Sequence, residues 1–158
     1  MSSIQEWLDA YSVSHKNKIN KVIHWFCVPL IMISLLGLLS LIKFSIEFNN
    51  NIYCISIAHI LVILALLFYL RLSLSISIGM FIISFIFLFI IYQFELLFSN
   101  STQLIIIYLS TFIVSWIGQF IGHKIEGVKP SFFEDIQFLL IGPAWLLSFI
   151  YNKFGIKY

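Results

Sequence analysis

Imidazole side chains gather in two short polar segments of an otherwise apolar chain. The first polar segment, HKNKINKVIHWFCVP, covers residues 15–29 and carries His15 and His24. The second polar segment, GHKIEGVKPSFFEDI, covers residues 122–136 and carries His123. Neutral imidazoles are good ligands for iron, zinc, copper and nickel. If the two segments meet in the fold, these histidines could bind a metal ion together.

Glu126 and His59 are further candidates for the same site. Glu126 follows His123 by three residues, and two histidines with one carboxylate are typical of non-haem Fe(II) oxygenases. His59 stands alone in an apolar run, either as a structural hydrogen-bonding residue or as an additional ligand. The chain has no H-E-x-x-H motif, zinc-type cysteine pair, phosphate loop or G-x-S-x-G motif. Its four histidines are too few for a many-histidine diiron site, so a metal site should be mononuclear.

A polar stripe leads into the second polar segment. Ser115, Gln119 and His123 recur every four residues, which places them on one face of a helix. Polar groups inside lipid are costly, so this face should point into a helical bundle and find partners there. Gly118 and Gly122 form a small-xxx-small pair that lets another helix approach closely. The stripe therefore indicates either a functional site or helix packing.

The elements that must position these residues are transmembrane helices. Of the 158 residues, 61% are hydrophobic and 10% are charged, whereas soluble domains carry about 25% charged residues. The net charge of +2 and the lack of a basic stripe argue against a nucleic-acid partner. We expect a single membrane-embedded domain over residues 1–158, an all-α polytopic helical bundle. Spans of about 20 residues are predicted near 22–42, 52–70, 74–94 and 103–122.

The two ends of the chain are expected to lie at the membrane surface. At the N-terminus, apolar residues recur at helical spacing, and Ser3 with Glu6 could form a capping box, so a surface helix with Trp7 at headgroup depth is predicted. Near the C-terminus, Ser131 and Glu134 could cap a helix that Gly142-Pro143 interrupts. Two short half-helices indicate a re-entrant or interfacial tail, or else a kinked fifth span.

The basic residues predict a cytoplasmic N-terminus. With that orientation only Lys43 falls outside, whereas the inner side holds Lys16, Lys18, Lys21, Arg71, Lys124 and Lys129. Both polar segments then lie at the same membrane level. His15 is nine residues before His24, about half a turn out of phase on one helix. The two rings can meet only if the helix breaks around Ser14–Lys16.

Taken together, the two polar segments are similar to a known family. The run H-x4-N-x3-H-x4-P is given by His15, Asn20, His24 and Pro29. The run QFIGH…EG…P begins at Gln119 and ends at Pro130, and DIQFLLIGPAWLL follows over residues 135–147. This pairing resembles the membrane family founded by the yeast 2-hydroxy fatty acid dioxygenase of phytosphingosine breakdown.

The resemblance implies a multi-span enzyme of the endoplasmic reticulum or of a bacterial inner membrane. Such enzymes use Fe(II) and O₂ to shorten a 2-hydroxy fatty acid by one carbon, with release of CO₂. Carried over to this chain, the motif histidines are the metal ligands His15, His24 and His123. His59 and Glu126 remain open as ligands.

Residues around the histidines have expected roles as well. Asn17, Asn20 and Gln119 are predicted to fix the imidazole tautomers, and Asn20, Gln119 and Glu126 are candidate catalytic residues. The lysines near the inner boundary should attract the acidic head of the substrate. Two other functions stay open. One is a haem-binding electron-transfer protein with axial His24 and His123. The other is a non-enzymatic scaffold or transporter, and a homodimer through the small residues of the stripe is a further possibility.

Overall fold

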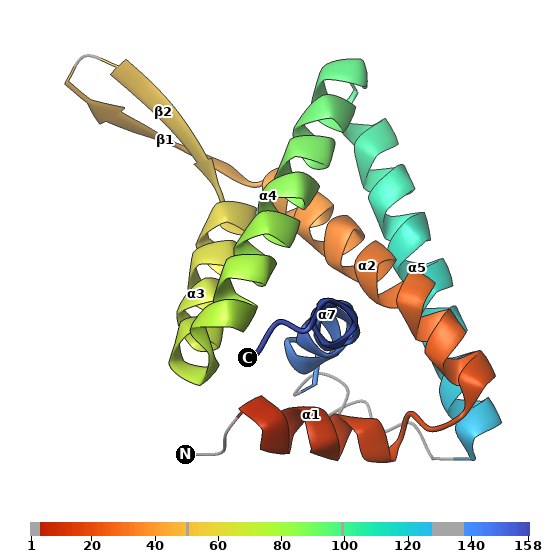
Figure 1. Ribbon diagram of the computed structural model, residues 1–158. Coiled ribbons are helices and arrows are strands. Elements are labelled where there is room, and N and C mark those ends of the chain that lie inside the picture. Colours follow the sequence, from red (N-terminus) through yellow and green to blue (C-terminus); the bar gives the residue numbers. More distant parts are fainter. Residues whose placement is uncertain (1–3, 50, 99, 128–137) are drawn as a thin grey trace.

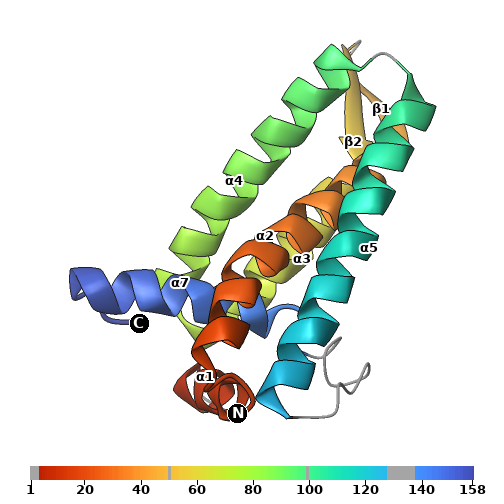
Figure 2. The ribbon, with the colours of Figure 1, turned by 90° about the vertical axis from the view of Figure 1, so that its right-hand side faces the viewer.

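The computed structural model describes residues 4–49, 51–98, 100–127 and 138–158. Three of its helices are long and apolar enough to cross a membrane: α2 (Lys18–Ser40), α4 (Leu74–Leu97) and α5 (Ser101–Glu126). All three are inclined in Figures 1 and 2, and α2 packs along α5. The expected all-α, membrane-type bundle is confirmed.

The outer faces of these helices are apolar, as a lipid environment requires. Phe81, Phe85 and Phe89 on α4 are each more than half exposed. A continuous apolar surface of this kind is unfavourable in water and normal against lipid tails. The face of α4 that carries these phenylalanines therefore lies on the outside of the bundle.

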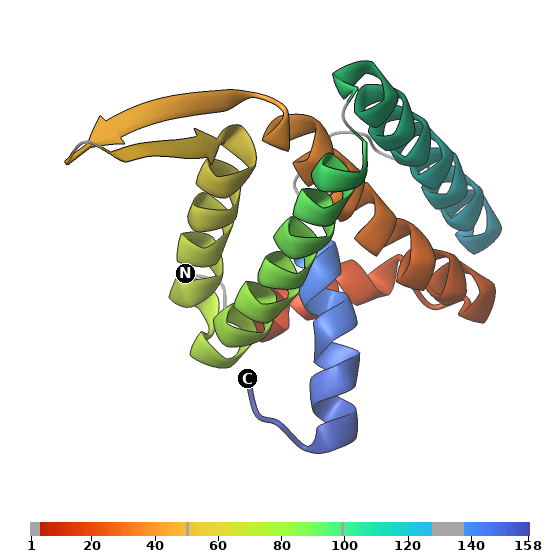
Figure 3. The ribbon, with the colours of Figure 1, turned by 90° about the horizontal axis from the view of Figure 1, so that it is seen from above.

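The predicted second span is wrong at its start. Residues Lys43–Phe48 form strand β1 and residues Asn51–Ser56 form strand β2, paired antiparallel with Lys43 opposite Ser56. Asn49, with a φ of 53°, lies in the turn between them, a conformation that asparagine tolerates well. Figure 3 shows this hairpin projecting to one side of the helices. The chain returns as α3 (Ile57–Leu72), whose 16 residues extend about 24 Å, less than the roughly 30 Å of hydrocarbon.

Two shorter helices lie crosswise near one end of these long helices. They are α1 (Ile4–Val13), which runs across the bottom of Figure 1, and α7 (Ile141–Phe154), which Figure 2 shows level with the lower turns of α2 and α5. The apolar face of α1 is buried through Ile4, Leu8 and Tyr11. The crosswise position of α7 is the arrangement expected for an interfacial tail rather than for a fifth span.

Gly142 and Pro143 do not interrupt a helix in the part of the chain that the structure describes. They lie in the first turn of α7, where a proline is tolerated because its missing N–H would have no partner in the helix. Every residue from Ile141 to Ser148 is buried. The predicted capping boxes at Ser3 and at Ser131–Glu134 lie outside the described residues.

Candidate metal centre

The chain leaves the helical conformation between α1 and α2, at the position where the meeting of the His15 and His24 rings requires a break. Helix α1 ends at Val13 and α2 begins at Lys18, so that His15 lies in the short connection. Asn17 caps α2, since its side-chain oxygen accepts a hydrogen bond from the Ile19 amide at 2.8 Å. The ring of Tyr11 stacks on the ring of His15 with centroids 4.1 Å apart. The connection therefore directs His15 back toward the first turns of α2.

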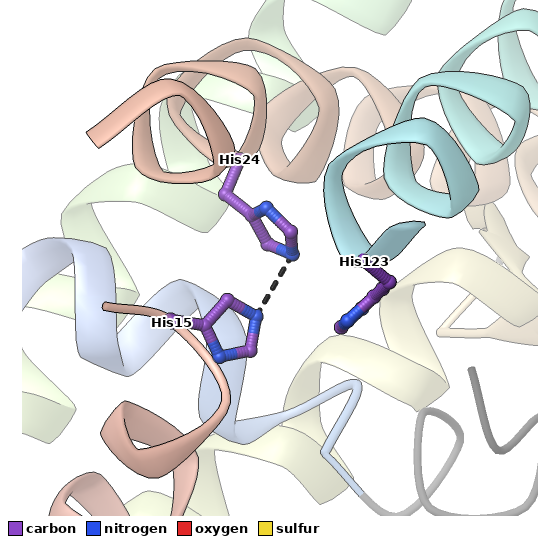
Figure 4. A group of neighbouring side chains, drawn as sticks. All are labelled: His15, His24 and His123. Carbon is purple, nitrogen blue, oxygen red and sulfur yellow. Dashed lines mark hydrogen bonds between the residues drawn. The ribbon is translucent and has the colours of Figure 1, made fainter. Parts of the chain in front are cut away.

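Three histidines from separate parts of the chain meet at this point. His15 comes from the α1–α2 connection, His24 from α2 and His123 from the end of α5. Figure 4 shows the three rings pointing toward one another. One ligand nitrogen of each ring lies within 4.8 Å of the others. All three side chains are buried, with exposed fractions of 2%, 0% and 6%.

Backbone carbonyls fix the tautomers of two of these rings. Nδ1 of His15 lies 2.6 Å from the Tyr11 carbonyl oxygen, and Nδ1 of His24 lies 2.9 Å from the Asn20 carbonyl oxygen. A carbonyl only accepts hydrogen bonds, so each Nδ1 must carry the proton. In the neutral rings both Nε2 atoms are then bare lone pairs. They face each other at 2.9 Å, the contact drawn dashed in Figure 4.

Two facing lone pairs repel each other unless a cation binds both of them. A shared proton is disfavoured at His15, because burial lowers the pKa of this ring from 6.5 to about 4, even though its hydrogen bond to Tyr11 acts in the opposite direction. A transition-metal ion bound to both nitrogens could satisfy the two lone pairs instead. Two nitrogens bound at about 2.1 Å and at right angles are about 3.0 Å apart, close to the observed separation. The three histidines therefore fit a mononuclear transition-metal ion.

Glu126 is not a member of this ligand group among the described residues. Its carboxylate accepts hydrogen bonds from the backbone amides of Lys16 at 2.8 Å and Asn17 at 2.8 and 3.1 Å. The side-chain amide of Asn20 also donates to it, at 3.0 Å. These bonds tie the end of α5, which carries His123, to the connection that carries His15. Glu126 thus positions the histidines, and the pattern of two histidines and a carboxylate does not apply.

The amide side chains do not have the predicted role at His15 and His24. Backbone carbonyls, rather than Asn17, Asn20 or Gln119, set those two tautomers. Asn20 is fully buried and links α2 to Glu126. Gln119 is also buried and lines a cavity next to His123.

The two small residues of the stripe serve packing within the chain. A Cβ atom added to Gly118 would lie 2.6 Å from Sγ of Cys27, and one added to Gly122 would collide with Oδ1 of Asn20. Both glycines therefore allow α2 and α5 to approach closely. Since α2 of the same chain occupies this face, Gly118 and Gly122 pack inside the chain, and a homodimer stays a prediction.

His59 lies away from the other histidines, so its inclusion among the ligands needs correction. It occupies the first turn of α3, where its Nδ1 contacts the Ser56 hydroxyl at 2.7 Å. With Ser40 and Glu95 it lines a cavity at the far end of α2. Ser40 is 16 residues beyond His24, which corresponds to about 24 Å along the helix. His59 thus has the structural role that was the alternative at the outset.

A small cavity opens beside the histidines. Its volume is about 40 Å³, and its wall includes Tyr11, Gln119, His123 and Pro143. A few water molecules or a small ligand group fit there, but a haem macrocycle does not. The arrangement therefore does not support the alternative of an axial pair formed by His24 and His123.

Sequence reasoning missed two aromatic residues at the centre. Trp145 of α7 has its ring 5.3 Å from that of His15 and donates a hydrogen bond from Nε1 to the Ser12 hydroxyl at 2.8 Å. Tyr11 supplies both the stacked ring and the carbonyl that orients His15. The spacing of Tyr11 four residues before His15 was a usable signal, whereas nothing local marks Trp145.

Comparison with known proteins places the chain in a family. Residues 1–154 match the family model described as 2-hydroxy-palmitic acid dioxygenase Mpo1-like. The chain belongs to this family. The match of the Mpo1-like model spans both polar segments, and with them the three histidines, Glu126 and Trp145. Neither a curated protein nor a solved structure shows significant similarity to the chain.

Proposed function

We propose that this protein is an Fe(II)-dependent dioxygenase that shortens 2-hydroxy fatty acids by one carbon. The observation that carries the proposal is the meeting of three buried imidazoles, two with their Nε2 lone pairs 2.9 Å apart, beside a small cavity in an apolar bundle. The description of the Mpo1-like family supports the substrate class. Iron, when bound, supplies Lewis acidity and one-electron chemistry with O₂.

The reaction balances without an external reductant. The 2-hydroxy acid and O₂ together contain all the atoms of the shortened acid, CO₂ and water. The carbon chain is oxidised, and the bond between the carboxyl carbon and the hydroxyl-bearing carbon breaks. O₂ accepts the electrons, so that a dedicated electron-transfer partner is unnecessary.

The residues of the chain have separate roles in this proposal. His15, His24 and His123 hold the metal, and because imidazoles are neutral ligands they leave its positive charge available to an anionic substrate. Gln119, in the wall of the cavity, offers an amide for hydrogen bonds to the hydroxy-acid head. Tyr11 and Trp145 cover the cluster with aromatic surface and exclude water.

Charged residues at the same end of the bundle suit an acidic substrate in a membrane. Lys16, Lys18 and Lys124 are exposed near the histidines, and Lys21 is half-buried. Their local potential attracts carboxylates to this end. We place the protein in a bacterial inner membrane or the endoplasmic reticulum membrane, with this end toward the cytoplasm.

Metal analysis and product identification test the proposal. Protein purified with Fe(II) under anaerobic conditions should hold about one iron per chain, and aerobic incubation with 2-hydroxypalmitate should give the acid one carbon shorter, identified by mass. His24→Ala and His123→Ala should lose iron and turnover, whereas His59→Ala should keep both. Iron-loaded protein that leaves the 2-hydroxy acid unchanged would refute the proposal, and protein without any bound metal would favour a non-enzymatic role.

A further inference from the structure

A second, larger cavity lies next to the one at the histidines. Its volume is about 280 Å³, and it is lined by residues of α2, α3 and α4 and by the residues just before α7. Ile31, Met32 and Leu139 line both cavities, so the two spaces share a wall. A ligand held at the histidines could therefore extend into the larger cavity.

The lining of this cavity suits a hydrocarbon and no charged group. Among its residues only two carry a hydroxyl group, Tyr69 and Ser84. Tyr69 already donates its hydrogen bond to the Leu140 carbonyl at 2.6 Å and is 1% exposed. The other lining residues are apolar: Ile31, Met32, Leu35, Leu36, Leu61, Val62, Ala65, Met80, Leu139 and Leu140.

The cavity also has a direction relative to the histidines. On α2, His24 precedes the shared residues Ile31 and Met32, and Leu36 follows them. Helix α3 begins at the end of the bundle where α2 finishes, so its early residue Leu61 lies with Leu36 at the distant end. A chain that enters past Met32 therefore runs away from the metal centre along α2.

We infer that this cavity binds the alkyl chain of the substrate and that its distant end sets the preferred chain length. The inference rests on the proposed function, which places the hydroxy-acid head at the histidines. Each methylene buried in such a cavity improves binding about fourfold, until the distant end is reached. Beyond that point a further methylene brings no gain.

Ala65→Phe is the variant that tests this inference. Ala65 lines the cavity and is half-buried, so a phenyl ring there would occupy space that the alkyl chain needs. The matched control is Leu64→Phe, because Leu64 is the neighbouring residue and is 58% exposed on the outer face of α3. We would measure kcat/KM for a homologous series of 2-hydroxy acids and the binding of a fluorescent fatty acid to the metal-free proteins in lipid nanodiscs.

The expected result is a change in selectivity at constant iron content. Ala65→Phe should lose at least about tenfold in kcat/KM for the longest acids, keep its activity on the shortest, and bind the fluorescent fatty acid more weakly. Leu64→Phe should match the wild type in both measurements. As a second variant, Leu61→Ala should move the optimum to longer acids, because it enlarges the distant end.

Failure of this inference and failure of the proposed function give different results. If the active wild type and both cavity variants share one chain-length profile and bind the fatty acid equally, the cavity does not hold the substrate chain. A wild type without selectivity for chain length would indicate a cavity filled by membrane lipid and would also overturn the inference. Iron-loaded wild type without any turnover would instead refute the proposed function.

Discussion

Glu126→Gln should weaken metal binding although Glu126 does not contact the metal site. The carboxylate accepts hydrogen bonds from the amides of Lys16 and Asn17 and from the side chain of Asn20. A glutamine keeps the shape of the side chain but replaces one acceptor oxygen by an NH₂ donor. That donor would face other donors, so the tie between α5 and the connection that carries His15 would loosen.

The size of the effect follows from the bonds that are lost. A hydrogen bond to a charged group contributes about 1.5–3 kcal/mol, and the substitution removes or weakens two such bonds. Glu126 is half-buried, so water recovers part of this loss, and about 1–3 kcal/mol remains. Since 1.4 kcal/mol is a factor of ten in affinity, the dissociation constant of the metal should rise about 5- to 150-fold.

An anaerobic titration with Co²⁺, followed by its visible absorption, measures this constant. Glu47→Gln is a matched control, since Glu47 lies on an exposed hairpin strand far along the chain from the histidines. Glu126→Asp, which keeps the charge, should restore part of the affinity. Equal dissociation constants for Glu126→Gln and Glu47→Gln would refute the assigned positioning role.

Two other perturbations give clear expectations. Gly122→Ala should lower the thermal unfolding temperature and weaken metal binding, because the new Cβ would displace the buried Asn20 side chain from Glu126. The free energy of unfolding lost in this way should exceed the roughly 1 kcal/mol that alanine gains over glycine in a helix. Ser110→Ala, an exposed change on the same helix, should leave both unaltered, and a Gly122→Ala protein of wild-type stability and affinity would contradict the packing described here. The metal-free protein should lose stability as the pH falls from about 6.5 to about 4, because in that window the unfolded chain binds a proton at His15 that the folded chain, with its lowered pKa, does not. Thermal unfolding at a series of pH values measures how the stability changes with pH. If the wild type and His15→Gln change equally, His15 does not contribute to the pH dependence.

The sequence predicted the meeting of the histidines because topology decides it. Charge placement put both polar segments at the same end of the spans, and the phase difference between His15 and His24 required a break at Ser14–Lys16, where the structure has one. Helix length and helix period decide both features, and side-chain rotamers do not affect them. Both can therefore be predicted without knowing any side-chain conformation.

Features that depend on side-chain conformation could not be predicted from the sequence. The choice of the Tyr11 and Asn20 carbonyls as partners of Nδ1 follows from the rotamers of His15 and His24, which no spacing rule gives. The role of Glu126 depends on how closely α5 approaches the start of α2. Sequence reasoning could place Glu126 near the site but could not distinguish a ligand from a residue that orients the ligands.

The hairpin was missed although its signal was present. KFSIEF alternates polar and apolar residues, and an asparagine-rich turn separates it from NIYCIS, the usual pattern of a β-hairpin. The apolar residues of β2 are followed directly by those of α3. Hydropathy alone therefore predicts one continuous span over both elements. The 16 residues of α3 are what remains of that span.

X-ray absorption spectroscopy of the iron-loaded protein tests the central claim most directly. A mononuclear iron with three imidazole ligands is expected in the wild type, and an unchanged set of ligands in His59→Ala. Iron without histidine scattering, or the same imidazole count in His15→Ala as in the wild type, would contradict this claim.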